Sequence, residues 1–131
     1  MISTRGRYAL RVMIDLAQHD GDAYVPLKDI SERQQLSKKY LEILVRDLVK
    51  GKMIVGSSGK GGGYKLLRNP EDYSVGEILE LMEGPLNTVA CLASDAIPCP
   101  RASECPTLPL WAEYDKMTHD YFYGKTLKEL L

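Results

Sequence analysis

The stretch Ser37–Leu67, SKKYLEILVRDLVKGKMIVGSSGKGGGYKLL, decides the fold. Its first half predicts a helix over Lys38–Lys50, because apolar residues recur there three and four positions apart. Ser37 can cap this helix and Gly51 can end it. Charged residues alternate with the apolar ones, so one face of the helix is predicted to be buried and the other exposed.

The second half of the stretch predicts a β-hairpin. Residues 53–57 and 64–67 are the expected strands, and the glycine-rich segment SGKGGG, residues 58–63, joins them. A tip made mostly of glycine lets its backbone approach another molecule closely. The glycines do not form a Walker nucleotide-binding loop, because no GK[ST] opens a helix here. A hairpin directly after such a helix is typical of a winged-helix domain.

A further helix is predicted just upstream, over Val25–Gln34, with Pro26 near its entry. The segment His19–Tyr24, HDGDAY, is predicted to be a turn before it. Only two residues separate this upstream helix from the Ser37 cap. Two helices joined by so short a turn, the second one basic at its exposed start, form the helix-turn-helix pattern of DNA-binding proteins.

The residues predicted to contact double-stranded DNA lie on the second of these helices, on the hairpin tip and near the N-terminus: Lys38, Lys39, Tyr40, Glu42, Arg46, Ser58, Lys60, Gly61, Arg5 and Arg7. Lysines at the start of a recognition helix can bind phosphates or guanine edges, and the sequence leaves both open. Glu42 can accept a hydrogen bond from cytosine, or it can pair with Arg46 one turn later in the same helix.

Residues 4–18 predict a first helix with Thr4 as its cap. Arg5, Arg7 and Arg11 crowd its first turns, where the helix dipole disfavours cations unless an anion lies nearby. DNA phosphates or solvent can satisfy these arginines.

Charge is divided unevenly along the chain. Through Arg68 there are 13 Lys and Arg against 7 Asp and Glu, a net of +6, and the remainder has 4 basic and 11 acidic residues, a net of −7. A basic first half suggests a polyanionic partner for that half alone. An uneven surface without a function would give the same division.

The chain has 131 residues, 44% of them hydrophobic and 27% charged, which suits one compact domain or a small domain with an appendage. No apolar run reaches the length of a membrane span, and the first residues lack the pattern of a signal peptide. An odd number of cysteines without a leader is typical of a reducing compartment. We therefore expect a cytoplasmic protein with no membrane partner.

Two more helices are predicted after the hairpin. Ser74 and Glu77 can form a capping box for a helix over Val75–Met82. A helical pattern with many aromatic residues then covers Thr107–Phe122, and a short amphipathic turn, Thr126–Leu131, follows it. Because helix-turn-helix proteins commonly bind two half-sites as dimers, we expect the aromatic helix to pair two protomers in a homodimer.

All the cysteines of the chain lie in one loop, CLASDAIPCPRASEC, as Cys91, Cys99 and Cys105. Prolines interrupt this loop, and neither helical nor strand periodicity fits it. Three thiols in one irregular loop suggest an iron–sulfur cluster, because thiolates hold such clusters and because zinc sites usually contain close cysteine pairs. Zinc, a thiol switch and buried structural cysteines are the alternatives. His19 and His119 stand alone and are expected at the surface.

In these stretches the sequence resembles the IscR-like family of winged-helix regulators, which also includes the nitric-oxide sensor NsrR and the cysteine-metabolism repressor CymR. The matching segments are STRGRYALRVMIDLA, VPLKDISERQQLSKKYLEILVRDLVKGKMI, GKGGGYKL and SVGEIL, in this order ahead of the cysteines. The resemblance implies a homodimeric bacterial transcription factor that binds DNA through recognition helices and wings. It also implies an iron–sulfur cluster on the three cysteines and control of cluster-biogenesis genes.

One position departs from that family's pattern. IscR-like proteins carry a histidine three residues after the last cysteine as the fourth ligand, and this sequence has Leu108 there. Some relatives use a carboxylate from the partner's first helix, but residues 5–11 contain no acid. The fourth ligand is therefore open among Asp95, Glu104, a residue of the partner subunit and an exogenous ligand.

The sequence thus predicts a mainly α-helical fold with a small β-wing. A winged helix-turn-helix DNA-binding domain, 1–73, precedes a segment, 74–131, that holds the cluster-binding loop at about 84–106 and a long dimerisation helix. The chain contains no catalytic constellation, so we expect a DNA-binding regulator and not an enzyme. It would sense iron–sulfur or redox status, with a 2Fe-2S cluster preferred over 4Fe-4S. The alternatives are a cluster-free repressor, acting in cysteine metabolism or through a thiol or nitric-oxide switch, and, last, an iron–sulfur electron-transfer protein.

Overall fold

The computed structural model describes residues 2–19, 21 and 23–131. Positions 20 and 22, which belong to the turn predicted at His19–Tyr24, lie outside the described residues. The helices and strands follow in the order α1 (Thr4–Gln18), α2 (Leu27–Gln34), α3 (Lys38–Lys50), β1 (Ile54–Ser57), β2 (Gly63–Leu66), α4 (Val75–Glu83) and α5 (Leu108–Tyr123), with 3-10 turns at Pro70–Asp72, Ala90–Leu92 and Leu127–Leu130. The predicted fold class, mainly helical with a small wing, is confirmed.

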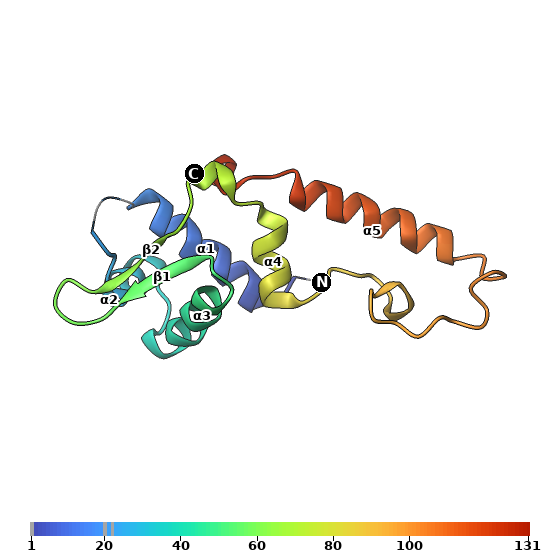
Figure 1. Cartoon of the computed structure of the whole chain (residues 1–131), viewed down its shortest axis with the longest axis horizontal. Helices are drawn as coiled ribbons and strands as arrows, with labels where there is room; N and C mark the ends of the chain where they lie inside the picture. The colour runs from blue at the N-terminus through green and yellow to red at the C-terminus, as the bar shows by residue number, and fades with distance from the viewer. Residues whose placement is uncertain (1, 20, 22) are drawn as a thin grey trace.

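The winged-helix elements gather at one end of the molecule, and α5 extends away from them (Figure 1). One core joins α1, α2, α3, the hairpin and α4, and its largest buried side chains include Met13, Leu44, Ile54 and Tyr73. Leu127, close to the C-terminus, is fully buried in the same core. The C-terminal turn is therefore part of the body that carries the wing.

The caps explain where three of the helices begin. The Ser37 side chain accepts a hydrogen bond from the Tyr40 amide at 3.2 Å, and Ser74 forms the predicted capping box at the start of α4. The prediction that Thr4 caps α1 is wrong, because Ser3 is the N-cap and Thr4 is already helical. A carboxylate of α4 binds both the amide and the hydroxyl of Ser3, which fixes that residue ahead of the helix.

The helix predicted over Val25–Gln34 begins two residues later than expected. Val25 exchanges two backbone hydrogen bonds of 2.8 Å with Tyr64 of β2, so it extends the wing instead of starting α2. Pro26 has an extended backbone and serves as the N-cap of α2. The wing itself is an antiparallel pair in which Ile54 faces Leu66.

The base of the wing is held by Tyr73, which is fully buried. Its hydroxyl donates to the carbonyl of Met53 at 2.6 Å and accepts from the amides of Leu67 and Arg68 at 2.9 and 3.0 Å. The residue before β1 and the residues after β2 are thereby tied to one side chain. Within this frame the tip of the wing is free to project.

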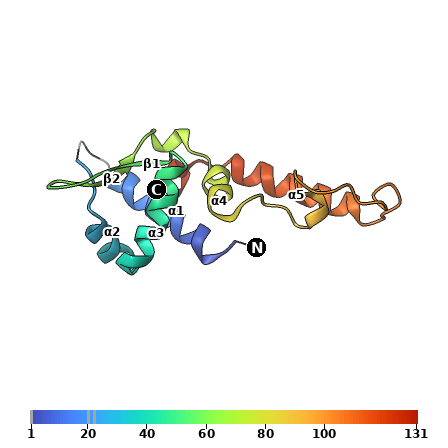
Figure 2. The same cartoon turned by 60° about the horizontal axis from the view of Figure 1, so that its bottom comes forward.

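α5 packs against α4, and most of the helix extends away from the winged-helix body (Figure 2). Its C-terminal end is anchored by Tyr123, whose hydroxyl donates to Glu80 at 2.6 Å and whose ring lies against Gly76. Burial and the hydrogen bond to Glu80 raise the pKa of Tyr123 to about 12. No residue of α5 is buried in the single chain. Among the described residues, none of the helices combines the length and the apolar character needed to cross a membrane.

Candidate nucleic-acid interface and cysteine loop

The start of α3 presents its cations to solvent. Lys38 and Lys39 are both exposed in the first turn of this helix. Tyr40, which was predicted to contact DNA with them, is only half-exposed, because its ring packs edge-on against Tyr8 of α1 with centroids 5.9 Å apart. Tyr40 therefore joins α3 to α1 and keeps one edge of its ring accessible.

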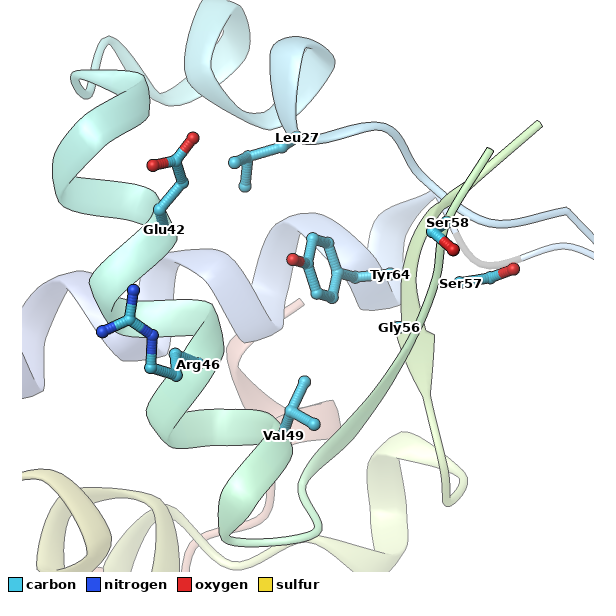
Figure 3. Close-up of a pocket in the computed structure, with 8 residues that line it drawn as sticks. All are labelled: Leu27, Glu42, Arg46, Val49, Gly56, Ser57, Ser58 and Tyr64. Carbon is cyan, nitrogen blue, oxygen red and sulfur yellow. The ribbon is translucent and has the colours of Figure 1, made fainter. Parts of the chain in front are cut away.

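A hollow of about 670 Å³ separates α3 from the wing. Its lining comes from α2, α3 and both strands: Leu27, Glu42, Arg46, Val49, Gly56, Ser57, Ser58 and Tyr64. Figure 3 shows Glu42 and Arg46 projecting from α3 and the Tyr64 ring reaching across from the wing. Within the described residues Glu42 and Arg46 form no ion pair with each other, so the alternative of an in-helix pair is not seen here.

The wing tip is almost free of side-chain bulk. Gly59 and Gly61 have φ of 84° and 76°, in the left-handed region that other residues rarely adopt. Ser58, Lys60 and Gly61 are all exposed. The tip can therefore bring one cation and a bare backbone close to a partner.

The arginines of α1 mostly have partners within the protein. Arg5 pairs with Asp47 of α3. Arg11 donates to the side-chain oxygen of Gln34 at 3.1 Å and to its carbonyl, and it lies over the Tyr8 ring. Arg7 is exposed and donates to the Thr4 hydroxyl at 3.2 Å. The predicted phosphate contacts of Arg5 and Arg7 stay predictions, with Arg7 the freer of the two.

An ion pair between a buried carboxylate and a solvent-accessible arginine joins α1 to α2. Asp15 is fully buried and accepts from Arg33 at 3.0 and 2.8 Å and from Gln34 at 3.0 Å. Burial raises the pKa of Asp15, but the hydrogen bonds from Arg33 and Gln34 outweigh burial and leave that pKa lowered. The carboxylate thus holds α2 in a fixed position.

Five residues that line the hollow beside α3 were not predicted from the sequence: Leu27, Val49, Gly56, Ser57 and Tyr64. Tyr64 directly follows the three glycines, and its place on β2 opposite Gly56 could have identified it. A glycine opposite an aromatic residue leaves that ring room to turn toward the helix.

The cysteine loop runs from the end of α4 to the start of α5. Cys91 and Cys99 are exposed, Cys105 is half-buried, and all three are free thiols. A hydrogen bond with the Thr107 hydroxyl, at 3.4 Å, lowers the pKa of Cys105. Among the residues that the structure describes, no three His, Cys, Asp or Glu side chains come together as a metal-binding group. The donor set fits an iron–sulfur cluster by its chemistry, since thiolates are the common ligands, and metal sites of this kind often assemble only on binding.

The expected position of a fourth ligand is apolar. Leu108 is the first residue of α5 and offers no donor atom. Asp95 and Glu104, the acids within the loop, are both exposed. The start of the loop is fastened to α5 by Asp115, which accepts from the Thr88 amide at 2.8 Å and from the Asn87 side chain at 3.5 Å.

The beginning of the loop is fastened to the DNA-binding body. Glu83, the last residue of α4, accepts from the Ser3 amide at 3.0 Å, the Ser3 hydroxyl at 2.6 Å and the Gly6 amide at 3.0 Å. Gly6 permits this approach, because a Cβ there would lie 2.3 Å from the carboxylate. Desolvation raises the pKa of Glu83, but the three hydrogen bonds at the positive end of α1 outweigh it and leave that pKa lowered.

Comparisons with known proteins agree with this arrangement. The family described as Rrf2, "Iron-dependent Transcriptional regulator", matches residues 2–131. Protein rrf2 of Nitratidesulfovibrio vulgaris is 38% identical, over 99% of this chain and 86% of that protein. The structure of CymR, the global cysteine regulator of B. subtilis, has a TM-score of 0.80 at 33% identity and covers 99% of this chain and 95% of CymR. T. potens IscR has a TM-score of 0.78 at 35% identity, over 99% of this chain and 85% of that one.

These similarities confirm the resemblance drawn from the sequence and the expectation that the protein is not an enzyme. They also decide between a regulator and an electron-transfer protein in favour of the regulator. The exposed start of α3 and the wing stay the predicted DNA contacts. The chain belongs to the Rrf2 family of DNA-binding transcriptional regulators.

Proposed function

We propose that this regulator senses iron–sulfur cluster status through the loop at about 84–106 and controls genes for cluster biogenesis. The observation that carries the proposal is that all three cysteines are free and share one loop, in a family described as iron-dependent. That loop contains one 3-10 turn, Ala90–Leu92, and no other helix or strand within the described residues. It can therefore rearrange around a ligand at low cost to the rest of the fold.

Cys91, Cys99 and Cys105 would hold the cluster, with 2Fe-2S preferred over 4Fe-4S. A bound cluster supplies a centre whose charge and ligands respond to oxidants and to iron supply. Leu108 cannot complete the set, so the fourth ligand is sought among Asp95, Glu104, the partner subunit and an exogenous molecule.

The contacts at the end of α4 give this loop a route to the DNA-binding surface. Glu83 precedes the loop and binds the first turn of α1. Arg5 in that turn pairs with Asp47 of α3, the recognition helix. A change in the shape of the loop can shift Glu83, and α1 then carries the shift to α3.

The exposed face of α5 supports a homodimer. Leu110, Tyr114, Met117 and Tyr121 are 56, 56, 63 and 61% exposed, and they follow one another at steps of four, three and four. A helix with such an apolar stripe needs a partner for it, and a second copy in two-fold symmetry provides the same stripe. Two recognition helices would then bind two half-sites of a promoter operator in the cytoplasm, acting as a repressor.

Lys38, Lys39 and Lys60 are the proposed phosphate contacts of this DNA complex. Replacing Lys38 and Lys39 together by alanine should weaken DNA binding and reduce its salt dependence, since each lost phosphate contact lowers the slope of log K against log salt by about 0.9. Lys128→Ala, a lysine exposed on the C-terminal turn, is the matched control and should leave both quantities unchanged. Unchanged binding by the double variant would mean that α3 does not enter the groove through its first turn.

Anaerobic purification followed by iron and sulfide analysis and visible absorbance tests the cluster. We expect coloured protein with bound iron and sulfide, and loss of both in Cys91→Ser, Cys99→Ser and Cys105→Ser. Leu108→His, which restores the ligand type that the family has there, should keep the iron and shift the absorbance bands. Colourless, iron-free protein after anaerobic reconstitution would reject the cluster.

A cluster-free repressor is the second candidate. Two observations favour it: the likeness to CymR, which is named as a cysteine regulator, and the separation of the three thiols. A thiol switch in the same loop would give DNA binding that changes with a thiol oxidant while bound iron stays absent. The iron analysis therefore distinguishes the two candidates directly.

A further inference from the structure

The hollow between α3 and the wing has a polar side that no contact within the protein uses. Arg46 and the Tyr64 hydroxyl face it, and within the described residues neither makes a hydrogen bond or an ion pair. Ser57 and Ser58 also line the hollow, but Figure 3 draws their hydroxyls pointing away from Arg46 and Tyr64. Two groups that can donate hydrogen bonds, the Arg46 guanidinium and the Tyr64 hydroxyl, thus face one open space (Figure 3).

The geometry of a winged helix on DNA says what passes through such a space. A recognition helix occupies the major groove, and a wing beside it reaches the neighbouring minor groove. The sugar–phosphate strand that divides the two grooves must then run between the helix and the wing. The hollow, about 670 Å³, is far larger than the roughly 30 Å³ of one water and is open to solvent.

We infer that Arg46 and Tyr64 hold a backbone phosphate of the operator strand that crosses this hollow. The inference rests on the DNA-binding function. It gives Arg46 the role of positioning and strengthening the bound protein on the DNA, and not that of recognising a base. A guanidinium and a phenol both donate to phosphate oxygens without regard to sequence. Glu42, at the same hollow, is an acceptor and has no place in a phosphate site.

The two side chains should leave different signatures in DNA binding. Without the Arg46 charge, one DNA phosphate fewer is neutralised and one counterion fewer is released on binding. The magnitude of the slope of log K against log salt should therefore decrease by about 0.9, and the affinity should decrease by about 10- to 100-fold. Tyr64→Phe keeps the ring and removes only a neutral donor. It should weaken binding by about two- to tenfold with the salt slope unchanged.

The experiment measures binding of the wild type, Arg46→Gln, Arg46→Lys and Tyr64→Phe to two duplexes over a salt series. One duplex is selected by the protein from a random library, and the other has the selected positions scrambled. We expect both losses to be equal on the two duplexes, and Arg46→Lys to keep the wild-type salt slope. Lys128→Gln is the control for a cation outside the hollow, and circular dichroism melts confirm that each variant is folded.

A loss confined to the selected duplex would overturn the inference, because it would make Arg46 or Tyr64 a base reader. Unchanged binding of Arg46→Gln and Tyr64→Phe to both duplexes would overturn it as well. Failure of the wild type to bind either duplex would instead reject the DNA-binding function on which the inference rests.

Discussion

The hydroxyl of Tyr73 is expected to stabilise the whole winged helix through the base of the wing. Tyr73→Phe keeps the buried ring and its contact with the Arg68 guanidinium, 4.2 Å from the ring centroid. It removes one bond to the Met53 carbonyl and two from the amides of Leu67 and Arg68. Each net bond is worth about 0.5–1.5 kcal/mol, so the three together are worth about 1.5–4.5 kcal/mol.

The free-energy cost of losing these hydrogen bonds is smaller where water can replace the Tyr73 hydroxyl, which is the case at two of the three partners. Leu67 is exposed and Arg68 half-exposed, so solvent can replace the hydroxyl at their amides, whereas the Met53 carbonyl is left unpaired in a buried place. We therefore expect Tyr73→Phe to lower the free energy of unfolding by about 2–3 kcal/mol. Urea denaturation at a fixed protein concentration measures this change, with the m-value unaltered.

Tyr24→Phe is the matched control for this substitution. Tyr24 is half-exposed, Lys65 contacts only its ring, and its hydroxyl has no hydrogen-bond partner within the described residues, so its change should stay within about 0.5 kcal/mol. If Tyr73→Phe is no more costly than this control, the hydroxyl does not hold the wing and the reasoning is refuted.

Three further predictions concern the supports of the same surface. Asp15→Ala removes a fully buried carboxylate that accepts hydrogen bonds from Arg33 and Gln34. Since the Arg33 left behind reaches solvent, the change should cost about 1–3 kcal/mol in urea denaturation. The folded-state pKa of Asp15 is lowered, so its carboxylate contributes fully to the free energy of unfolding above the unfolded-state pKa of about 4. This contribution is lost as the pH falls through the folded-state pKa. Over that acid range the wild type should therefore lose more stability than Asp15→Ala. Gly6→Ala should lower the melting temperature, because the new Cβ displaces the Glu83 carboxylate. This is expected although alanine is about 1 kcal/mol more favourable than glycine inside a helix. A variant with a higher melting temperature would show that the contact with Glu83 is dispensable. Met117→Lys places a charge in the apolar stripe of α5 and should yield monomers in sedimentation equilibrium, and a persistent dimer would locate the interface elsewhere.

Much of this fold follows from patterns that are local in the sequence. Serine caps, glycine stops and apolar spacing set the bounds of α3 and α4 to within a residue, because each of those signals acts within one or two helical turns. The start of α2 was misplaced for a reason that is not local. Val25 pairs with Tyr64, a residue 39 positions later, and no signal near Val25 announces that bridge.

In the candidate site too, local features could be predicted from the sequence and long-range contacts could not. Lys38, Lys39 and Lys60 were found from their places at a helix start and a loop tip, and the structure exposes all three. The partners of Arg5 and Glu83 could not be found, because Asp47 and Ser3 lie 42 and 80 positions away from them. The sequence therefore identifies which groups can bind DNA more readily than which groups the fold has already used.

If the proposed cluster in the cysteine loop controls the winged helix, loading the cluster must change the affinity for DNA. This affinity is measured on one anaerobic preparation and its selected duplex before and after cluster loading, with Cys91→Ser in parallel. We predict a change in affinity of at least about tenfold on loading, equivalent to about 1.4 kcal/mol of coupling, and no change in the variant. Equal affinity of the loaded and unloaded wild type would contradict the account.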